Sequence, residues 1–313
     1  MQRSREFGPA ADEAALEVDA GASGPSVPDV SVVLPVFNGE RTIADQLEAV
    51  LHQESQFTFE VVVVDNDSTD GTPDLVECFS QRDPRVRRVI APDQHNLSYV
   101  RNVGVRSARG RFVLFCDDDD VVASGWLEAM GLALLANPFV VSRMEYEQLN
   151  PPEVMRGRAR FHSERLDQLF GYTVANGAIG IHREVWEALG GNDEHLGVAG
   201  EDFDLAIRAQ RDLGVTPVFV ETATYHYRQR DGVKSTWVQA RRYGRSHVAL
   251  YKRYGLGRVD LPAERRRAVR DWWWIVTRAP LLVERNRRVL WARKAGMRVG
   301  RLLGSFHERV LYL

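Results

Sequence analysis

The chain has 313 residues, of which 44% are hydrophobic, so it can form one large domain or two ordinary ones with a real core. Its formal net charge of −2 gives no overall case for nucleic-acid binding. The two cysteines, Cys78 and Cys116, do not indicate a disulfide framework and favour a reducing cytoplasm. No apolar run approaches the roughly 18 residues of a membrane span, and the N-terminus lacks the apolar stretch of a signal peptide. We therefore expect a cytoplasmic protein.

Residues 1–29 are rich in Ala, Gly, Pro, Ser and acidic residues without apolar periodicity, which predicts a disordered leader. Apolar runs typical of strands follow at residues 31–37, 59–65, 86–90 and 111–116. Helical spacing or capping residues lie between them, around residues 43–51, 73–81 and 98–107. This alternation predicts an α/β fold with a mostly parallel central sheet and helices on both faces.

Polar residues follow three of these strands. The first strand ends at Phe37 and Asn38, the second at Asp65, and the last runs into four aspartates at residues 117–120. Ligands of such sheets bind beyond the carboxyl ends of the strands, so we expect all three clusters at one edge. Four adjacent carboxylates repel one another, and a hard cation such as Mg²⁺ or Mn²⁺ that also holds a diphosphate is a suitable counter-charge. A solvated acidic turn is the alternative.

Four segments resemble, in order, the family 2 glycosyltransferases of GT-A fold. They read SVVLPVFNGERTIADQLEAVLHQ, VVVVDNDSTDGT, SYVRNVGVRSARGRFVLFCDDDD and GEDFDLAIRAQ, and the resemblance covers about residues 30–228. It implies a GT-A catalytic domain, which we place at residues 30–230. It also implies a metal-dependent, inverting enzyme of the hexosyltransferase type, which moves a sugar from a nucleotide-diphosphate donor to an acceptor hydroxyl.

The resemblance, carried over by position, implies a set of donor-binding residues. Asp65 would hydrogen-bond the nucleotide base, and Arg101 would line the nucleotide pocket. The full donor set is Pro35, Phe37, Glu40, Asp65, Arg101, Asp117, Asp118 and Gly177. The chain departs from the family in reading DNDS at residues 65–68, where DDGS is common, which leaves the base preference open. It also has Asn96 where a glycine often stands.

The same resemblance implies the metal ligands and the base. Asp117 and Asp119 match the metal-binding DXD positions, and His226, at the end of a predicted strand, would complete the metal site. Inverting transfer needs a carboxylate that takes the acceptor's proton. The family's base is the aspartate of the pair at residues 201 and 202, so Asp202 is the predicted base, and Glu201 would bind acceptor hydroxyls. A position at a helix start should keep Asp202 ionised. An acidic first helical turn without catalytic role is the alternative.

Three other functions compete with that of a glycosyltransferase. A non-catalytic sugar-nucleotide-binding or scaffold protein of GT-A type is the main alternative, and the intact acidic sets at 117–119 and 201–202 argue against it. A nucleotidyltransferase would need a glycine-rich basic loop after the first strand, and PVFNGE at residues 35–40 is not one. A dehydrogenase would need GxGxxG in the first turn, which the chain lacks.

Residues 231–313 are predicted to form a helical, basic, Trp-rich extension. From residue 255 to 313 the chain has 14 Lys and Arg against 5 Asp and Glu, a net charge of +9. Tryptophans among arginines at helical spacing resemble an interfacial membrane helix, which would suit a lipid-linked acceptor at the inner face of the plasma membrane. This suggests surface-polysaccharide, glycolipid or glycoconjugate biosynthesis. A helical cap on the catalytic domain or a homodimer contact is the alternative, and single-stranded nucleic acid is a more remote one.

Overall fold

The computed structural model describes residues 27–155, 165–175, 177–196, 199–230, 232–278 and 285–312. Residues 1–26 of the predicted leader lie outside the described residues.

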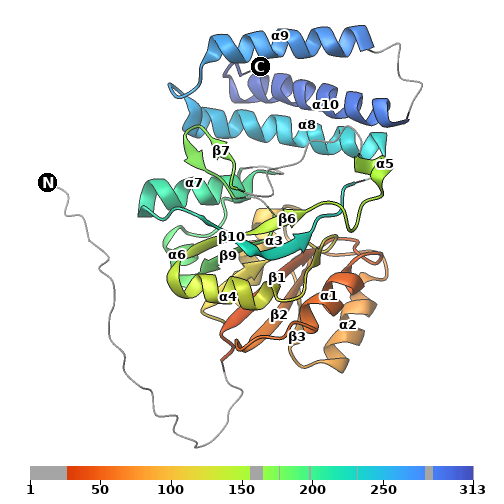
Figure 1. The fold of residues 1–313 in the computed structure, drawn as a ribbon, viewed down its shortest axis with the longest axis vertical. Helices are drawn as coiled ribbons and strands as arrows, with labels where there is room; N and C mark the ends of the chain where they lie inside the picture. The colour runs from red at the N-terminus through yellow and green to blue at the C-terminus, as the bar shows by residue number, and fades with distance from the viewer. Residues whose placement is uncertain are drawn as a thin grey trace, which may run out of the picture.

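The centre of the molecule is an eight-stranded sheet with the order β3-β2-β1-β4-β9-β6-β10-β5 (Figure 1). Its strands are β1 (Val30–Val36), β2 (Phe59–Asp65), β3 (Val86–Ile90), β4 (Phe112–Phe115), β5 (Val121–Val122), β6 (Phe139–Glu145), β9 (Ile179–His182) and β10 (Val218–His226). β3, β2, β1 and β4 are parallel, as are β6 and β10. The predicted parallel sheet is therefore confirmed, with two exceptions.

The exceptions are β5 and β9, which run antiparallel to their neighbours. β9 lies between β4 and β6, so the residues that precede it meet the carboxyl end of β4: Ile179 is the register partner of Phe115. This reversal brings Gly177 to the edge of the sheet where the aspartates that follow β4 lie. The local sequence of a four-residue strand does not encode its direction, so the prediction did not include it.

Helices cover both faces of the sheet, as predicted. They are α1 (Ile43–Leu51), α2 (Thr72–Arg82), α3 (Leu97–Ser107), α4 (Trp126–Ala136), α6 (Arg183–Ala188) and α7 (Glu201–Leu213). The strands send alternate residues to the two faces. Val61 and Val63 pack in a core with α1, α2 and α4, whereas Val62 and Val64 pack in a second core with α3, α6 and α7. Trp126 and Trp186 are buried in these cores, and neither is available to a sugar.

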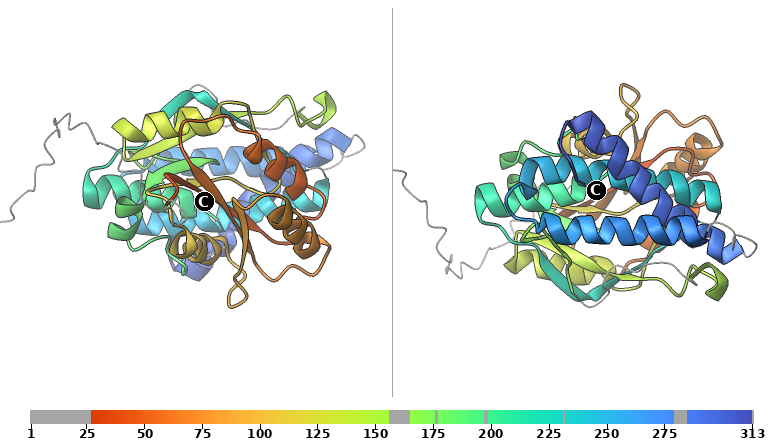
Figure 2. Two further views of the ribbon diagram at one scale, coloured as in Figure 1. Left: turned by 90° about the horizontal axis from the view of Figure 1, so that it is seen from below. Right: turned by 90° about the horizontal axis from the view of Figure 1, so that it is seen from above.

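The C-terminal part is a layer of helices, as expected. It comprises α8 (Val233–Leu250), the π-helical turn η1 (Tyr251–Gly255), α9 (Leu261–Arg278) and α10 (Arg285–Glu308). α8 lies next to the part of the molecule that contains the sheet and α9 is outermost, and the view from above shows α9 and α10 crossing (Figures 1 and 2). Among the described residues, no helix combines the length and apolar character needed to cross a bilayer.

The helices of the layer pack closely on one another, and the layer shares a core with the rest of the chain. A Cβ on Gly300 of α10 would lie 2.2 Å from the carbonyl oxygen of Arg241 in α8, so only glycine permits this approach. A third core joins the layer to α7 and to the small hairpin of β7 (Gln168–Leu169) and β8 (Tyr172–Thr173). A single-turn helix, α5 (Pro152–Met155), follows β6. The extension is thus a structural cap, which was one of the predicted alternatives.

Candidate active site

The four aspartates form a turn directly after β4, held in place by Gln46 of α1. The Gln46 side chain is fully buried; its Nε2 donates to the carbonyl oxygen of Asp117 at 3.0 Å, and its Oε1 accepts from the amide of Val122 at 3.0 Å. One glutamine therefore clamps both ends of the acidic turn. A lone glutamine within an amphipathic helix gives no sequence signal of this role.

Three of the aspartates form a cluster that could hold a cation. One carboxylate oxygen from each of Asp117, Asp119 and Asp120 lies within 4.8 Å of the others. Burial, reinforced by the charge of Asp117, raises the pKa of Asp119 to about 6. Burial and Asp119 likewise raise the pKa of Asp118 to about 8 and that of Asp120 well above its usual range. Burial and mutual repulsion disfavour the ionised form of these carboxylates, and a hard divalent cation would stabilise it. Such a cation prefers oxygen ligands of this kind.

Arg101 of α3 is the cation that the protein itself supplies here. Its side chain is 4% exposed; Nη1 lies 3.0 Å from Glu201 Oε1 and Nη2 lies 3.2 Å from Asp117 Oδ1. The guanidinium also lies over the ring of Phe115, 5.6 Å from its centroid. Arg101 therefore joins the predicted metal site to the predicted base pair, which lie far apart in the sequence.

Asn96, where the family often has glycine, has a defined structural role at the start of α3. Its backbone is extended rather than left-handed, with φ −141°, and its side chain accepts a hydrogen bond from the amide of Tyr99 at 2.7 Å. It is thus the N-cap of the helix that carries Arg101.

Glu201 and Asp202 open α7, as predicted, after Gly200 with φ +89°. The expectation that Asp202 stays ionised is wrong. Its Oδ1 accepts from the amide of Phe203 at 2.8 Å, but burial and the neighbouring Glu201 outweigh this bond and raise the pKa of Asp202 to about 8. Desolvation of the carboxylate exceeds the stabilisation that a helix start provides.

The DNDS segment after β2 forms a tight turn around Asp65. The Asp65 carboxylate is fully buried, accepts from the amide of Ser68 at 2.9 Å and pairs with Arg88 Nε at 3.0 Å. Asp67, which replaces the family's glycine, has a positive φ of 63°, a conformation that Asp adopts more readily than most residues. Asn66 Nδ2 donates to the carbonyl of Gln94 at 2.9 Å. The departure from the family thus keeps the backbone turn.

The loop after β1 borders both other polar clusters. Pro35 is buried in the strand, and Phe37 is 53% exposed, with its ring centroid 5.6 Å from that of His95. Glu40 Oε2 accepts from the amide of Gly71 at 3.1 Å. A Cβ on Gly39 would lie 2.4 Å from Asp118 Oδ2, so this glycine lets the acidic turn approach the loop.

Gly177 has φ +74°, and a Cβ there would lie 1.6 Å from the hydroxyl oxygen of Tyr225. Glycine is required by this contact. Gly180 lies within β9, where the side chains of Leu114 and Val140 fill the space beside it. It is a packing residue of the sheet and has no room for a substrate.

His226, the last residue of β10, is the register partner of Val121, directly after the acidic turn. Its Nδ1 lies 2.7 Å from Glu145 Oε2, and its ring does not belong to the cluster of Asp117, Asp119 and Asp120. The structure therefore places His226 beside the acidic turn, bonded to Glu145, and its role as a ligand stays a prediction.

Two residues of this site were missed by the sequence reasoning. Asp120 is 2% exposed, and its Oδ1 accepts from the amide of Arg228 at 2.8 Å. The Arg228 side chain donates from Nε to the carbonyl of Asp119 at 2.8 Å and reaches Asp45 Oδ2 at 3.2 Å. The DXD pattern covers only Asp117 and Asp119, so it did not include Asp120. The only sequence signal for Arg228 is that it lies two residues after His226.

The sheet topology, with the acidic turn at the carboxyl end of β4, is that of the GT-A fold. Residues 31–185 match the family model described as glycosyl transferase family 2.

Curated relatives are similar over about a third of the chain. The chain is 41% identical over 104 residues to the succinoglycan biosynthesis protein ExoO of Rhizobium meliloti, an alignment that covers 33% of this chain and 29% of that protein. It is 37% identical over 93 residues to the putative teichuronic acid biosynthesis glycosyltransferase TuaG of Bacillus subtilis, covering 30% and 36%. The matches thus span about a third of the length of these relatives.

Solved structures extend the likeness to the whole fold. The mannosyltransferase PcManGT from Pyrobaculum calidifontis, solved with GDP-Man and Mn²⁺, aligns with a TM-score of 0.62 over 91% of this chain and 89% of that one, at 19% identity. GalNAc-T7, solved with UDP, GalNAc and Mn²⁺, aligns with a TM-score of 0.52 over 66% and 44%, at 17% identity. At these identities the likeness establishes the fold.

Proposed function

We propose that the chain is a metal-dependent inverting glycosyltransferase that moves a sugar from a nucleotide-diphosphate donor to an acceptor hydroxyl. The observation that carries this proposal is the Arg101 bridge between Asp117 and Glu201, because it joins a cation site and a base site at one sheet edge. The relatives named for succinoglycan and teichuronic acid biosynthesis support a role in surface-polysaccharide or glycoconjugate assembly.

In this proposal Asp117, Asp119 and Asp120 hold Mn²⁺ or Mg²⁺. The metal would offset the charge that develops on the leaving diphosphate. His226 is the proposed further ligand: Glu145 occupies Nδ1, which leaves Nε2 as its ligand atom, and a carboxylate commonly orients a metal-binding histidine in this way. The solved neighbours that contain Mn²⁺ support a divalent ion.

The proposed donor site lies between the loops after β1, β2 and β4. Its residues would be Pro35, Phe37, Glu40, Asp65, Arg101, Asp117, Asp118 and Gly177. The exposed ring of Phe37 is suited to contact the nucleotide, and Gly177 lets the backbone approach Tyr225 closely at the edge that β9 reaches. The carboxylate of Asp65 is fully buried and bonded to Arg88, so its proposed contact with the base requires the turn at residues 65–68 to open.

Asp202 is the proposed general base. Its neighbour Glu201 is bonded to Arg101, whereas the carboxylate of Asp202 accepts only from the amide of Phe203 among the hydrogen bonds of the described residues. A carboxyl group with a pKa of about 8 is a stronger base once ionised than an ordinary aspartate. Glu201 would then orient the acceptor. We propose residues 30–230 as the catalytic unit and residues 231–313 as its helical extension.

The proposal is tested by thermal unfolding with a panel of nucleotide diphosphates, with and without Mn²⁺, together with hydrolysis of the matching sugar nucleotide. We expect one nucleotide to raise the unfolding temperature only when Mn²⁺ is present, and the matching donor to be hydrolysed slowly. Stabilisation without any turnover of the donor, with or without candidate acceptors, would identify a sugar-nucleotide-binding protein instead.

The two free cysteines, of which Cys116 is buried, support the proposed cytoplasmic location.

A further inference from the structure

The inner face of helix α9 packs within the helical cap. Ala268 and Ile275 are buried, at 3% and 4% exposed. Both acidic residues of the helix also turn inward: Glu264 bonds Arg301 of α10 at 3.1 Å, and Asp271 bonds Arg298 of α10 at 3.0 Å. The negative charge of α9 is therefore neutralised within the cap.

The outer face of α9 is apolar along its centre. Val269, Trp273 and Val276 are 70%, 71% and 68% exposed. At about 100° per residue, these three side chains fall within a sector of about 60° on the helix surface. Large apolar side chains that gather on one exposed face indicate an interaction surface rather than chance exposure.

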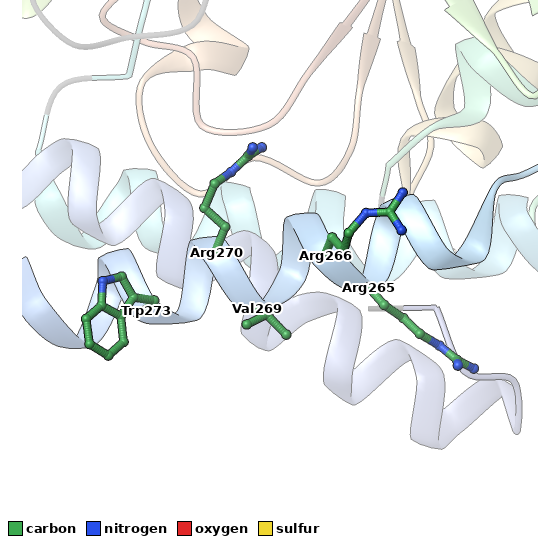
Figure 3. A pocket seen from close by; sticks show the side chains of 5 residues that line it. All are labelled: Arg265, Arg266, Val269, Arg270 and Trp273. Carbon is green, nitrogen blue, oxygen red and sulfur yellow. The ribbon is translucent and has the colours of Figure 1, made fainter.

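Arginines flank this apolar line on both sides. Helical geometry puts Arg265 on one side of it and Arg266 and Arg270 on the other. Together with Val269 and Trp273 these arginines line a surface hollow on α9 alone, in which the side chains of Arg266 and Arg270 point to one side of the helix and Trp273 to the other (Figure 3). In the described part of the chain, none of the three arginines lies within ion-pair distance of an acidic side chain.

Trp274 and Trp291, two other tryptophans of the tail, are structural. Trp274 lies beneath Lys294, whose Nζ is 5.1 Å from the ring centroid. Trp291 stacks on Trp237 of α8, with centroids 6.4 Å apart, and its Nε1 donates to the carbonyl of Ile275. Of the run at residues 272–274, Trp273 is the side chain that projects fully into solvent. A tryptophan that is not needed by the cap is therefore placed at the centre of its outer surface.

We propose that this face of α9, defined by Arg265, Arg266, Val269, Arg270, Trp273 and Val276, docks on an anionic phospholipid surface. An apolar line bordered by cations on an outermost helix suits the headgroup region, where the apolar side chains enter the acyl boundary and the guanidinium groups meet phosphates. Figure 1 shows α9 on the far side of α8 and α10 from the catalytic sheet, so the catalytic part does not obstruct the approach.

Charge complementarity favours lipid over a second copy of the chain. A symmetric contact through this face would gather the arginines of both copies into one interface, and like charges brought together cost affinity. An anionic bilayer instead supplies the opposite charge along the whole helix. The proposal is independent of the catalytic proposal, because it uses none of the residues at the sheet edge.

The test is co-sedimentation of the full chain with phosphatidylcholine vesicles, with and without phosphatidylglycerol, at low and high salt. We expect binding that needs the anionic lipid and weakens with salt. Replacement of the three arginines together (Arg265→Gln, Arg266→Gln, Arg270→Gln) should weaken binding about a hundredfold, since each basic residue at such a surface contributes about fivefold. Trp273→Phe should retain binding but lose a large part of the blue shift of tryptophan emission that vesicles induce.

The matched control removes three exposed arginines from the catalytic half (Arg82→Gln, Arg106→Gln, Arg211→Gln) and should leave binding unchanged. All variants should keep the thermal unfolding of the parent, because the positions are exposed. Equal binding to neutral vesicles, or equal loss in both triple variants, would overturn the proposal. So would a concentration-dependent dimer that Trp273→Ser dissociates in the absence of lipid, which would identify a second copy as the occupant.

Discussion

At the scale of single residues, charge balance governs the site. Arg101 is one buried cation set between Asp117 and Glu201, with the other aspartates of the turn and Asp202 nearby. Burial is the main cause of the raised pKa values of Asp118, Asp119 and Asp202, and the neighbouring carboxylates add to it, while Arg101, Arg228 and Arg230 offset only part of the effect. Because the ionised forms of these carboxylates are disfavoured, a divalent cation bound among them would supply the positive charge that stabilises them.

The first prediction concerns the metal. Asp119→Asn should abolish transfer and the stabilisation by Mn²⁺ while the fold is retained, because the replaced carboxylate is buried beside like charges and disfavours its own ionisation. Since protons compete with the metal at Asp119, stabilisation of the parent by Mn²⁺ should weaken as the pH falls below about 6. Thermal unfolding and a transfer assay measure both effects. The exposed Asp74→Asn is the control, and full activity of Asp119→Asn at saturating Mn²⁺ would contradict the metal assignment.

The second prediction concerns the base. Asp202→Asn should lower kcat by roughly 10²–10⁴ with donor affinity nearly unchanged, because it removes a proton acceptor and no metal ligand. Only the ionised carboxylate accepts a proton, so the activity of the parent should rise with pH through about 8. Steady-state kinetics and donor titration separate the two quantities. Asp212→Asn, exposed on the same helix, is the control, and a collapse of donor binding in Asp202→Asn would transfer the role to Glu201.

At the scale of elements, the position of α7 depends on one buried carboxylate. Asp204 is fully buried and accepts from Arg208 Nε at 2.7 Å, Arg253 Nη1 at 2.9 Å and the hydroxyl of Tyr254 at 2.5 Å. The last two residues belong to the π-helical turn η1. Asp204 thus ties the helix that presents Asp202 to the C-terminal layer, two residues from the proposed base.

The third prediction follows from this tie. Asp204→Ala should reduce the free energy of unfolding by about 3–5 kcal/mol, because it leaves two guanidinium groups without their buried partner. Denaturant titration measures the loss. The matched variant is Asp212→Ala, whose carboxylate is 41% exposed and pairs with Arg211 at the surface, so its cost should be about 1 kcal/mol or less. Equal effects of the two variants would mean that α7 is held by packing alone.

At the scale of the whole molecule, the cap and the catalytic half share one packed structure. Glycines let α10 approach α8: a Cβ on Gly244 of α8 would lie 2.3 Å from the carbonyl of Met297 in α10. α7, the hairpin and η1 meet in the third core. The extension therefore packs against the part of the molecule that contains the sheet, while the centre of the outer face of α9 is exposed.

The fourth prediction tests this packing. Gly300→Ala should destabilise the protein by about 1–3 kcal/mol, although alanine favours a helix by about 1 kcal/mol, because the added methyl meets backbone and the two helices must move apart. Thermal and denaturant unfolding measure the change. Leu303→Ala, at an exposed position of the same helix, should change stability by about 0.5 kcal/mol or less. A stabilised Gly300→Ala variant would show that α8 and α10 are not closely packed.

The sequence alone determined the α/β alternation, the edge at which the acids gather and the helical nature of the extension. These follow from local patterns: continuous apolar strands alternate with helices, and β1, β2 and β4 end in polar residues that parallel pairing brings together. The positions of Phe37, Asp65 and Asp117 at one edge need nothing beyond that alternation.

The tertiary structure determined the features that depend on burial and on contacts between segments that are remote in the sequence. It set Arg101 against Glu201, 100 positions later in the chain, and it reversed β9 between β4 and β6. It also overrode the local effect of the helix start on Asp202, because burial of a carboxylate depends on everything packed around it. For the same reason only the packing of α9 on α10 selected Trp273, among similar tryptophans, as the one that faces solvent.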